Sequence, residues 1–492
     1  MFVKSARVDE SGIFVRIGNM TRVSSSPASN GRARASSGSS GSIKTYRNAL
    51  AYLDTLTNHE LSSRSAYNQQ SFNLARMQRL LAALGNPHRA FPSAHVAGTK
   101  GKGSTCAMLG AMLKGCGFTV GSYSSPHILD VRERIQIGDE LISQSDFTRM
   151  IAAVSKAAAK PKVGDPTYFE VLTAAAFLYF KEAGVDIAVI EVGLGGRLDS
   201  TNVIKPEVVG ITSISHDHQQ LLGTTLAQIA EEKAGTFKPK VPVVSAPQRP
   251  EVKETLRRVA AEVGAPLRFT GDEIEFSYRF EATRGIGRHT RLCLTTPVSR
   301  FEHLHVPLLG EHQAINCGLA LGMLDTLKQR GFKIDDQQAM DGLASVRIPG
   351  RMEIIREHPR VLVDVAHNAA SVDALMRAIG QNVLSDSMVV IFGCRRDKDI
   401  PGMIRAIQLG ADKIIFTRTQ SPRSADPADL AAEYTEQSGR NAQVTQSLDD
   451  AMHIALSAAG REDLICIAGS FVLVAEAKRK YTQKPEAVES ST

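Results

Sequence analysis

The sequence predicts an α/β protein built on mostly parallel sheets. Short apolar runs alternate with helical patterns along most of the chain, and this alternation is typical of parallel sheets covered by helices on both faces. A length of 492 residues suits two or three packed units. The chain contains 43% hydrophobic and 22% charged residues, so each unit can bury a core of ordinary size.

The elements are predicted from apolar runs and from helical spacing. Strands are expected at residues 94–97, 119–123, 187–192, 207–211, 242–245, 361–364, 388–392, 413–416 and 464–468. Helices are expected at residues 43–56, 72–84, 104–114, 145–159, 168–182, 225–234, 250–263, 312–330, 369–380, 427–438 and 448–459. Residues 265–308 contain short runs that alternate with polar residues, which predicts a β-rich excursion at the edge of the first sheet.

The best domain boundary is the SVRIPG stretch at 345–350, where Pro-Gly interrupts a helical pattern before a new series of strands. We therefore expect a first domain at 44–344, a linker at 345–350 and a second domain at 351–484. Residues 1–43 are rich in Ser, Gly and Arg and cannot bury enough apolar surface to fold, so we expect a disordered tail there. A second tail is expected at 485–492.

Composition excludes several classes of protein. The net charge is +7, but the first 43 residues carry +4 of it, so the folded part lacks the dense basic surface of a nucleic-acid-binding protein. No apolar run approaches the roughly 20 residues that a membrane-spanning helix needs. The six cysteines are scattered without a CxxC pair, which argues against a disulfide framework or a zinc site and favours a cytoplasmic protein.

The strongest functional signal is HVAGTKGKGST at 95–105, which follows a predicted strand and opens a predicted helix. Glycines at such a junction let the backbone curl, so that N–H groups and the helix N-terminus face an anion. Lys102 can reach the β- and γ-phosphates of a nucleotide, and the hydroxyl of Ser104 or Thr105 can add a further contact. The residues that we expect to contact the nucleotide are Gly98, Thr99, Gly101, Lys102, Gly103 and Ser104.

Three polar clusters follow other strands of the first domain and predict a metal site. They are YSSPHILDVRERI with Ser125, VIEVGLGGRLDSTN with Glu191, and SISHDHQQLLG with His218. Open α/β sheets bind ligands just beyond the carboxyl ends of their strands, and Mg²⁺ prefers oxygen ligands. Taken singly, Ser125 fits a turn residue and His218 a structural residue; beside a phosphate loop, the three together favour a Mg²⁺ site.

Other motifs leave more than one interpretation open. Lys233 in IAEEKAG is most simply a lysine that satisfies the C-terminal end of its helix. In the second domain, Arg351 can stabilise phosphate charge, while Asp364 and Asn368 fit helix caps and ligands equally well. The FGCRRDKD stretch at 392–399 fits either a ligand-facing loop or a solvated one.

In combination, these residues resemble the folylpolyglutamate synthase/dihydrofolate synthase family, the folate branch of the Mur ligase superfamily. The stretches that carry the resemblance are GTKGKGS, SSPH…ERI, TYFEVLTAAAF, EVGLGGRLDSTN, HDHQQLLG, IAEEKAG, GEHQAIN, IPGR and DVAHN, in that order. The resemblance covers about residues 44–480. It implies a P-loop ATPase domain of the Mur ligase type and a smaller C-terminal Rossmann-like domain that carries the glutamate-ligase function.

The resemblance also implies the reaction: ATP-dependent addition of L-glutamate to folate or dihydropteroate through an acyl phosphate on the pterin substrate. It assigns catalytic roles to Lys102, Lys233 and His367, and Mg²⁺ ligation, with two ions, to Ser125, Glu191 and His218. Lys233 matches a lysine that is carbamylated in the family. Nucleotide contacts fall on Asn316, Arg351 and Asp364, and pterin contacts on Thr167, Phe169, Leu198, Asp199 and Ser200. A monomer without nucleic-acid or membrane partners is expected.

Two other functions fit the sequence less well. A Mur-type ligase acting on a cell-wall precursor is disfavoured by the additional Gly103 in the phosphate loop and by the LDSTN stretch. A GTPase-type switch would require an NKxD loop for guanine, which the sequence lacks, and it would have no use for the second domain with DVAHN.

Overall fold

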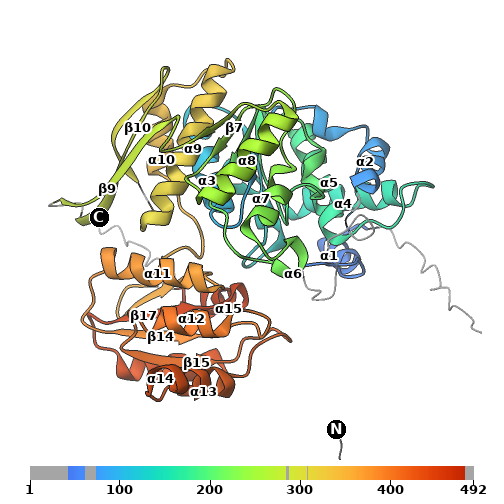
Figure 1. Cartoon of the computed structure of the whole chain (residues 1–492). Helices are drawn as coiled ribbons and strands as arrows, with labels where there is room; N and C mark the ends of the chain where they lie inside the picture. The colour runs from blue at the N-terminus through green and yellow to red at the C-terminus, as the bar shows by residue number, and fades with distance from the viewer. Residues whose placement is uncertain (1–42, 61–71, 73, 284–286, 307, 483–492) are drawn as a thin grey trace, which may run out of the picture. The chain divides into compact units, whose positions relative to one another are not determined.

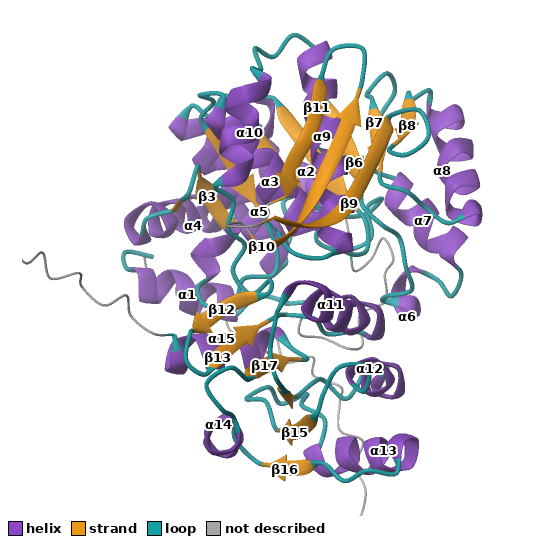
Figure 2. Cartoon of the chain, turned by 90° about the vertical axis from the view of Figure 1, so that its left-hand side faces the viewer, coloured by secondary structure: helices purple, strands orange, loops and turns teal. Residues whose placement is uncertain are grey.

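The computed structural model describes residues 43–60, 72, 74–283, 287–306 and 308–482; the expected tails at 1–43 and 485–492 lie outside them, apart from residue 43. Elements α1 to α10 form an N-terminal lobe and elements β12 to α15 a C-terminal lobe (Figure 1). In both lobes, strands are flanked by helices (Figure 2). None of the described helices is long and apolar enough to cross a membrane.

The first sheet has eight strands in the order β4-β3-β2-β5-β1-β6-β7-β8, parallel except for β3 and β4. Its strands are β1 (Ser93–Ala97), β2 (Val120–Tyr123), β3 (Ile135–Ile137), β4 (Glu140–Leu141), β5 (Ile187–Glu191), β6 (Val208–Ile211), β7 (Val243–Ser245) and β8 (Leu267–Phe269). The predicted parallel sheet is thus confirmed. β3 and β4 are too short to leave a pattern in the sequence, because pairing rather than local propensity defines them: β3 pairs with β2, and β4 pairs with β3.

Helices cover both faces of this sheet. They are α1 (Tyr46–Asp54), α2 (Leu74–Ala83), α3 (Lys102–Gly115), α4 (Gln144–Ala158), α5 (Tyr168–Ala183), α6 (Gln219–Leu222), α7 (Leu226–Ala234), α8 (Pro250–Val263), α9 (Glu311–Gln329) and α10 (Asp336–Ala344), with 3₁₀ turns at Pro87–Arg89, Val131–Arg134 and Ser200–Val203. Alternate strand residues serve different cores, as a pleated strand requires. Val208 packs with α3 and α9, whereas Val209 and Ile211 pack with α7 and α8.

The excursion at 265–308 is β-rich, as predicted, but only β8 lies at the edge of the first sheet. β9 (Glu275–Thr283), β10 (Gly287–Thr295) and β11 (Arg300–Val306) form a separate antiparallel sheet. Leu292, Leu294 and Phe301 of this sheet are buried in the same core as α9. Its strands pair with one another, so they need no place beside β8.

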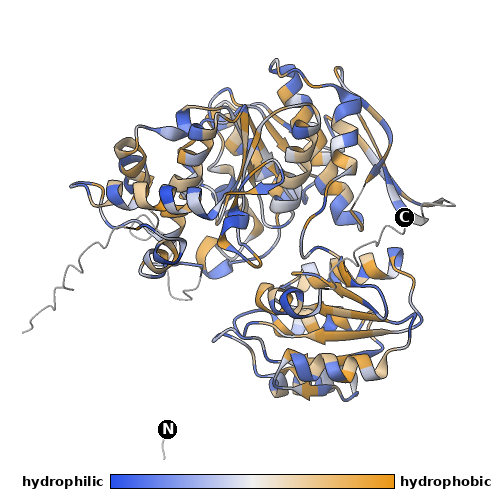
Figure 3. Cartoon of the chain, turned by 180° about the vertical axis from the view of Figure 1, so that it is seen from behind, coloured by the Kyte–Doolittle hydropathy of each residue, from blue (hydrophilic) through white to orange (hydrophobic). Residues whose placement is uncertain are grey.

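The second sheet has the order β12-β13-β17-β14-β15-β16 and is parallel except for β12. Its elements are β12 (Glu353–Arg356), β13 (Arg360–Val363), α11 (Ala369–Asn382), β14 (Met388–Phe392), α12 (Ile400–Ile407), β15 (Lys413–Thr417), α13 (Pro427–Ser438), β16 (Gln443–Thr445), α14 (Leu448–Ala458), β17 (Leu464–Ala468) and α15 (Phe471–Tyr481). Its central strands are hydrophobic along their length (Figure 3), as a parallel sheet buried on both faces requires.

The sequence prediction missed α10, α12, α15, β12 and β16. The first turn of α12 contains Pro401 and Gly402. Both residues usually signal a turn, but proline is tolerated at the start of a helix, and Asp399 caps this one by accepting the Gly402 N–H at 3.0 Å.

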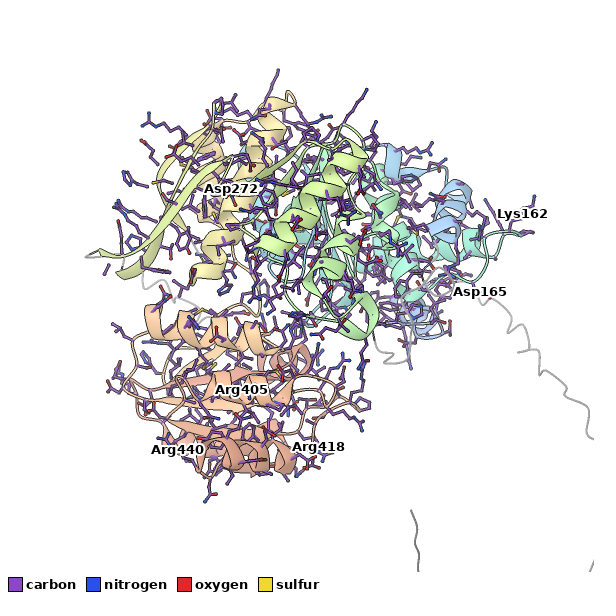
Figure 4. All side chains as sticks on the ribbon, in the orientation of Figure 1. Lys162, Asp165, Asp272, Arg405, Arg418 and Arg440 are labelled. Carbon is purple, nitrogen blue, oxygen red and sulfur yellow. The ribbon has the colours of Figure 1, made fainter. Side chains whose placement is uncertain are left out.

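Charged side chains cover the outside of the fold. Asp272, Arg418 and Arg440 are exposed (Figure 4), and two of them are paired: Asp272 with Lys253 at 2.6 Å, and Arg418 with Asp426 at 2.7 Å.

Candidate active site

The candidate site lies at the carboxyl edge of the first sheet. Parallel register places Val96 of β1 beside Glu191 of β5, and Ala97 beside Ile211 of β6. Tyr123 of β2 lies beside Ile190 of β5. The loops after these four strands therefore begin at one edge of the sheet, where open α/β sheets bind their ligands.

The phosphate loop requires its glycines. Gly98 and Gly101 have φ angles of 142° and 87°, a region that favours glycine. A Cβ on Gly98 would lie 1.8 Å from Thr212 Oγ1, and one on Gly101 would lie 2.1 Å from Asn316 Oδ1. The loop is thus packed between the end of β6 and helix α9, with the 4%-exposed Asn316 side chain directly against it.

Unpaired hydroxyls surround this loop. In the described part of the chain, Thr105 Oγ1, Thr212 Oγ1 and Ser215 Oγ are buried without a hydrogen-bond partner. Helix α3, which begins at Lys102, also has no side-chain cap on its N-terminal N–H groups. Unpaired buried polar groups are costly unless a ligand or water completes them, so these groups fit the phosphate chain of a nucleotide.

The predicted metal ligands lie in neighbouring loops. Glu191 is 5% exposed, and its Oε2 accepts the Ser125 N–H at 3.1 Å. Burial raises the pKa of Glu191, against the lowering effect of the Lys102 charge and the Ser125 N–H. His218 follows β6 with a side chain that is 47% exposed.

These groups suit Mg²⁺ only in combination with further oxygens. The described residues contain no group of three or more His, Cys, Asp or Glu side chains placed to hold a metal ion. Mg²⁺ is commonly held by one or two carboxylates, with substrate phosphates and waters completing its shell. A buried carboxylate, a serine and an imidazole around a phosphate loop fit that donor set.

Lys233 contacts the phosphate loop rather than the end of its own helix. Its Nζ donates a hydrogen bond to the Gly98 carbonyl at 2.7 Å, so the simplest interpretation, a lysine satisfying the end of α7, does not describe it. The side chain is 4% exposed. Burial and the neighbouring Lys102 charge lower the pKa of Lys233 to about 7. Near neutral pH, a substantial fraction of this amine is therefore uncharged and nucleophilic.

In the C-terminal lobe, the Asp364 carboxylate is hydrogen-bonded to backbone N–H groups of neighbouring loops. Its two carboxylate oxygens accept the N–H groups of Met352 at 2.9 Å and Ala366 at 2.8 Å. Burial raises its pKa, while the charge of Arg351 lowers it. Asn368 is the N-cap of α11 and forms a capping box with Ser371, which settles the cap interpretation for Asn368.

His367 follows Asp364 and is held in one orientation. Its Nδ1 lies 2.9 Å from the Val365 carbonyl, so Nδ1 carries the proton. Its ring centroid lies 5.4 Å from that of Phe471. Burial lowers the pKa of His367 to about 4, so the ring is neutral at physiological pH.

The structure adds one pair that the sequence did not assign. Asp217 Oδ2 accepts a hydrogen bond from Asn368 Nδ2 at 3.3 Å, and Lys398 Nζ lies 3.7 Å from Asp217 Oδ1. The side chains of Asp217 and Lys398 are 13% and 14% exposed. Although burial opposes it, the charges of His218 and Lys398 hold the pKa of Asp217 at about 2. The HDH and RRDKD stretches are conspicuous in the sequence, but nothing in it indicates that they meet.

The residues predicted to contact the pterin lie at the start of α5 and on the loop after β5, and α5 contacts the 3₁₀ turn of that loop. Thr167 caps α5 in a capping box with Glu170, and Phe169 lies in the first turn. The Phe169 ring presses on Gly193, where a Cβ would lie 2.6 Å from Cζ, and its centroid is 5.9 Å from that of Tyr123. Leu198 and Asp199 are 7% and 3% exposed, and Ser200 is half-buried.

Comparison with known proteins identifies two family domains. Residues 96–324 match the Mur ligase middle domain, and residues 350–471 match the glutamate ligase domain of Mur ligases. The dihydrofolate synthase/folylpolyglutamate synthase of Bacillus subtilis is 34% identical over 412 residues, covering 83% of this chain and 94% of the relative.

Solved structures agree with this match. The folylpolyglutamate synthase of Mycobacterium tuberculosis complexed with ADP superimposes with a TM-score of 0.80 at 31% identity, covering 91% of this chain and all of that one. A bifunctional folylpolyglutamate synthase/dihydrofolate synthase with Mn, AMPPNP and L-glutamate bound gives a TM-score of 0.74 at 29% identity, covering 88% and 97% of the two chains. These matches do not favour the cell-wall alternative. The chain belongs to the folylpolyglutamate synthase/dihydrofolate synthase family of Mur ligases.

Proposed function

We propose that this protein uses ATP and a divalent cation to add L-glutamate to reduced folates and to dihydropteroate. Family membership supports the reaction class. The observation that carries the proposal is the carboxyl edge of the first sheet, where the phosphate loop, Glu191 and the Lys233 amine lie together. The ligands bound by the family member with Mn, AMPPNP and L-glutamate support the choice of nucleotide, cation and amino acid.

The chemistry follows from the weakness of a carboxylate as an electrophile. Transfer of the γ-phosphoryl group of ATP to the carboxylate of the pterin substrate creates a good leaving group. The amino group of L-glutamate then attacks the acyl carbon, and phosphate leaves. Lys102 and the N–H groups at the start of α3 stabilise charge on the transferred phosphoryl group. Two Mg²⁺ ions, held by Ser125, Glu191 and His218, would neutralise phosphate charge at this point.

Lys233 fits a second role in the same site. An amine with a pKa of about 7 can react with CO₂ to give a carbamate, which replaces a buried cation by an anion. A carbamate at this position would supply oxygen atoms beside the phosphate loop, where the proposed Mg²⁺ ions need them. In the C-terminal lobe, we assign Arg351 and Asp364 to the nucleotide and the neutral His367 to the incoming glutamate.

The pterin is proposed to lie along the wall formed by Thr167, Phe169 and residues 198–200. We further propose a cytoplasmic monomer, in keeping with its six free cysteines, and size-exclusion chromatography with light scattering tests the monomer.

Purified protein supplied with ATP, Mg²⁺ and L-glutamate, and with dihydropteroate or tetrahydrofolate in parallel, tests the function. We expect glutamate-dependent phosphate release with both substrates and a product heavier by one glutamyl residue. Absence of glutamate-dependent phosphate release with both would refute the proposal, and release with only one would restrict it to that substrate.

A further inference from the structure

A buried histidine lies just before the phosphate loop and has no role in the proposed chemistry. His95 is fully buried in β1, three positions before Gly98. Its Nε2 lies 2.8 Å from Thr201 Oγ1, which comes from the loop after β5. This contact links the strand that carries the phosphate loop to the segment that contains Leu198, Asp199 and Ser200.

The direction of this hydrogen bond is fixed by its neighbour. Thr201 Oγ1 donates its single proton to Asp199 Oδ1 at 2.5 Å. Thr201 must therefore accept from His95, so Nε2 carries the imidazole proton and Nδ1 is an acceptor. Nδ1 is buried and has no hydrogen-bond partner in the described part of the chain. Burial lowers the pKa of His95 to about 3, so the ring stays neutral in this tautomer.

Asp199 connects the His95–Thr201 hydrogen bond to the loop at 193–200. Besides the Thr201 hydroxyl, its carboxylate accepts the N–H groups of Thr201 at 3.0 Å and of Leu194 at 2.9 Å. These bonds fix the glycine-rich turn at 193–196, and Gly193 of that turn packs directly under the Phe169 ring. A displaced Asp199 would release both the turn and the aromatic ring.

We propose that His95 is a positioning residue for the pterin site, acting through Thr201 and Asp199 on the 193–200 loop and on Phe169. This rests on the proposed function, which assigns the wall to the pterin. An apolar residue would fill a central strand position without leaving an unpaired acceptor, which is costly in a core. The position instead holds a histidine that donates a hydrogen bond to Thr201. We therefore assign the histidine to the hydrogen-bonded chain His95–Thr201–Asp199 rather than to the packing of the core.

Two pairs of variants distinguish the loss of a hydrogen bond from a change in side-chain volume. The side-chain amide of His95→Gln reaches the position of Nε2, whereas the amide of His95→Asn reaches that of Nδ1. Thr201→Ser keeps the hydroxyl, and Thr201→Val keeps only the shape. Thr255→Val is the matched control, because Thr255 is a buried residue of α8 whose hydroxyl donates to the Glu251 carbonyl of the same helix.

His95→Asn and Thr201→Val should raise the KM for the pterin substrate about tenfold, the effect of one lost hydrogen bond. Their KM for ATP and their kcat should stay within about twofold of the wild-type values. His95→Gln, Thr201→Ser and Thr255→Val should resemble the wild type. Equal loss in His95→Gln and His95→Asn, an equal rise in the KM for ATP, or no change in any variant would overturn the proposal.

The wild-type protein provides a readout that does not depend on the folding of variants. In ¹⁵N-histidine NMR spectra, His95 should appear as the neutral Nε2–H tautomer, and pterin binding should shift its signals. An Nδ1–H tautomer would contradict the proposed chain of hydrogen bonds. Lack of glutamate-dependent turnover in the wild type would instead refute the proposed function, and the tautomer would still be measurable.

Discussion

The two sheets place polar residues at the same kind of edge but treat them differently. At the carboxyl edge of the first sheet, Thr105, Thr212 and Ser215 have buried hydroxyls without partners in the described chain. At the corresponding edge of the second sheet, Asp364 accepts two backbone N–H groups and Asn368 caps α11. Thr417 Oγ1, at the end of β15, is also buried there without a partner in the described chain.

This difference distinguishes polar groups that are hydrogen-bonded within the protein from buried polar groups that a ligand can bond. A buried polar group normally finds a partner within the protein, and the second edge follows this rule at Asp364 and Asn368. The first edge departs from it beside the phosphate loop, where the ionisable side chains of Glu191 and Lys233 are also buried. Variants at the first edge should therefore mainly reduce activity, whereas variants of the helix cap Asn368 at the second edge should mainly reduce stability.

The largest effect is expected for Glu191→Gln or Lys102→Met. Each removes a charge from the phosphoryl-transfer site, so glutamate-dependent phosphate release should fall at least about a thousandfold. Circular dichroism should show an intact fold. Asp325→Asn is the matched control, because Asp325 is a buried carboxylate paired with Thr296 and Gln329 and should keep its activity. Near-wild-type turnover in Glu191→Gln would refute the assignment of this edge.

Lys233→Met should reduce the rate about a hundredfold or more, because it removes both the hydrogen bond to Gly98 and the proposed carbamate. Mass spectrometry at neutral pH with bicarbonate should detect an added CO₂ on the wild type that the variant lacks, and its absence would contradict the proposed carbamate. Lys328→Met, which loses only a surface pair with Asp336, is the control. Full activity of Lys233→Met would exclude a role for this side chain.

Asn368→Ala tests the prediction for the second edge, where loss of a helix cap should affect stability. Loss of the N-cap of α11 should lower the free energy of unfolding by about 1 kcal/mol, measured by urea denaturation. Ser447→Ala, which removes the N-cap of α14, should cost a similar amount. The rate should fall less than tenfold in both. A thousandfold loss in Asn368→Ala alone would show that the Asn368 side chain itself contacts a reacting group.

The smallest expected effect is the contribution of His95 to the pH dependence of the free energy of unfolding. In the folded protein, the pKa of His95 lies at about 3, below the ordinary value of about 6.5. As pH falls below 6.5, the unfolded chain gains a proton that the folded chain does not, so stability decreases. Between pH 8 and pH 6, the free energy of unfolding of the wild type should fall by about 0.8 kcal/mol more than that of His95→Gln. A constant difference between the two proteins would mean that His95 titrates normally in the fold.

Much of the fold could be predicted because its signals are local. Apolar runs such as 187–191 and 388–392 indicate buried parallel strands without any tertiary information. The missed elements include α10, α15, β12 and β16. Among the others, β3 and β4 exist through pairing, and α12 begins with residues that usually break helices. The separate sheet of β9 to β11 was misplaced because alternation predicts strands but not their neighbours.

The sequence by itself determined the phosphate loop and the family, since glycine, lysine and hydroxyl residues at fixed spacing carry that chemistry locally. Only the tertiary structure decided that Lys233 Nζ reaches Gly98, that Asp217 meets Lys398 and Asn368, and that His95 hydrogen-bonds Thr201. These contacts join residues separated by about a hundred or more positions. Such pairings depend on strand order and burial, which set the distances between the side chains and shift their pKa values. Strand order and burial cannot be derived from the spacing of residues along the chain.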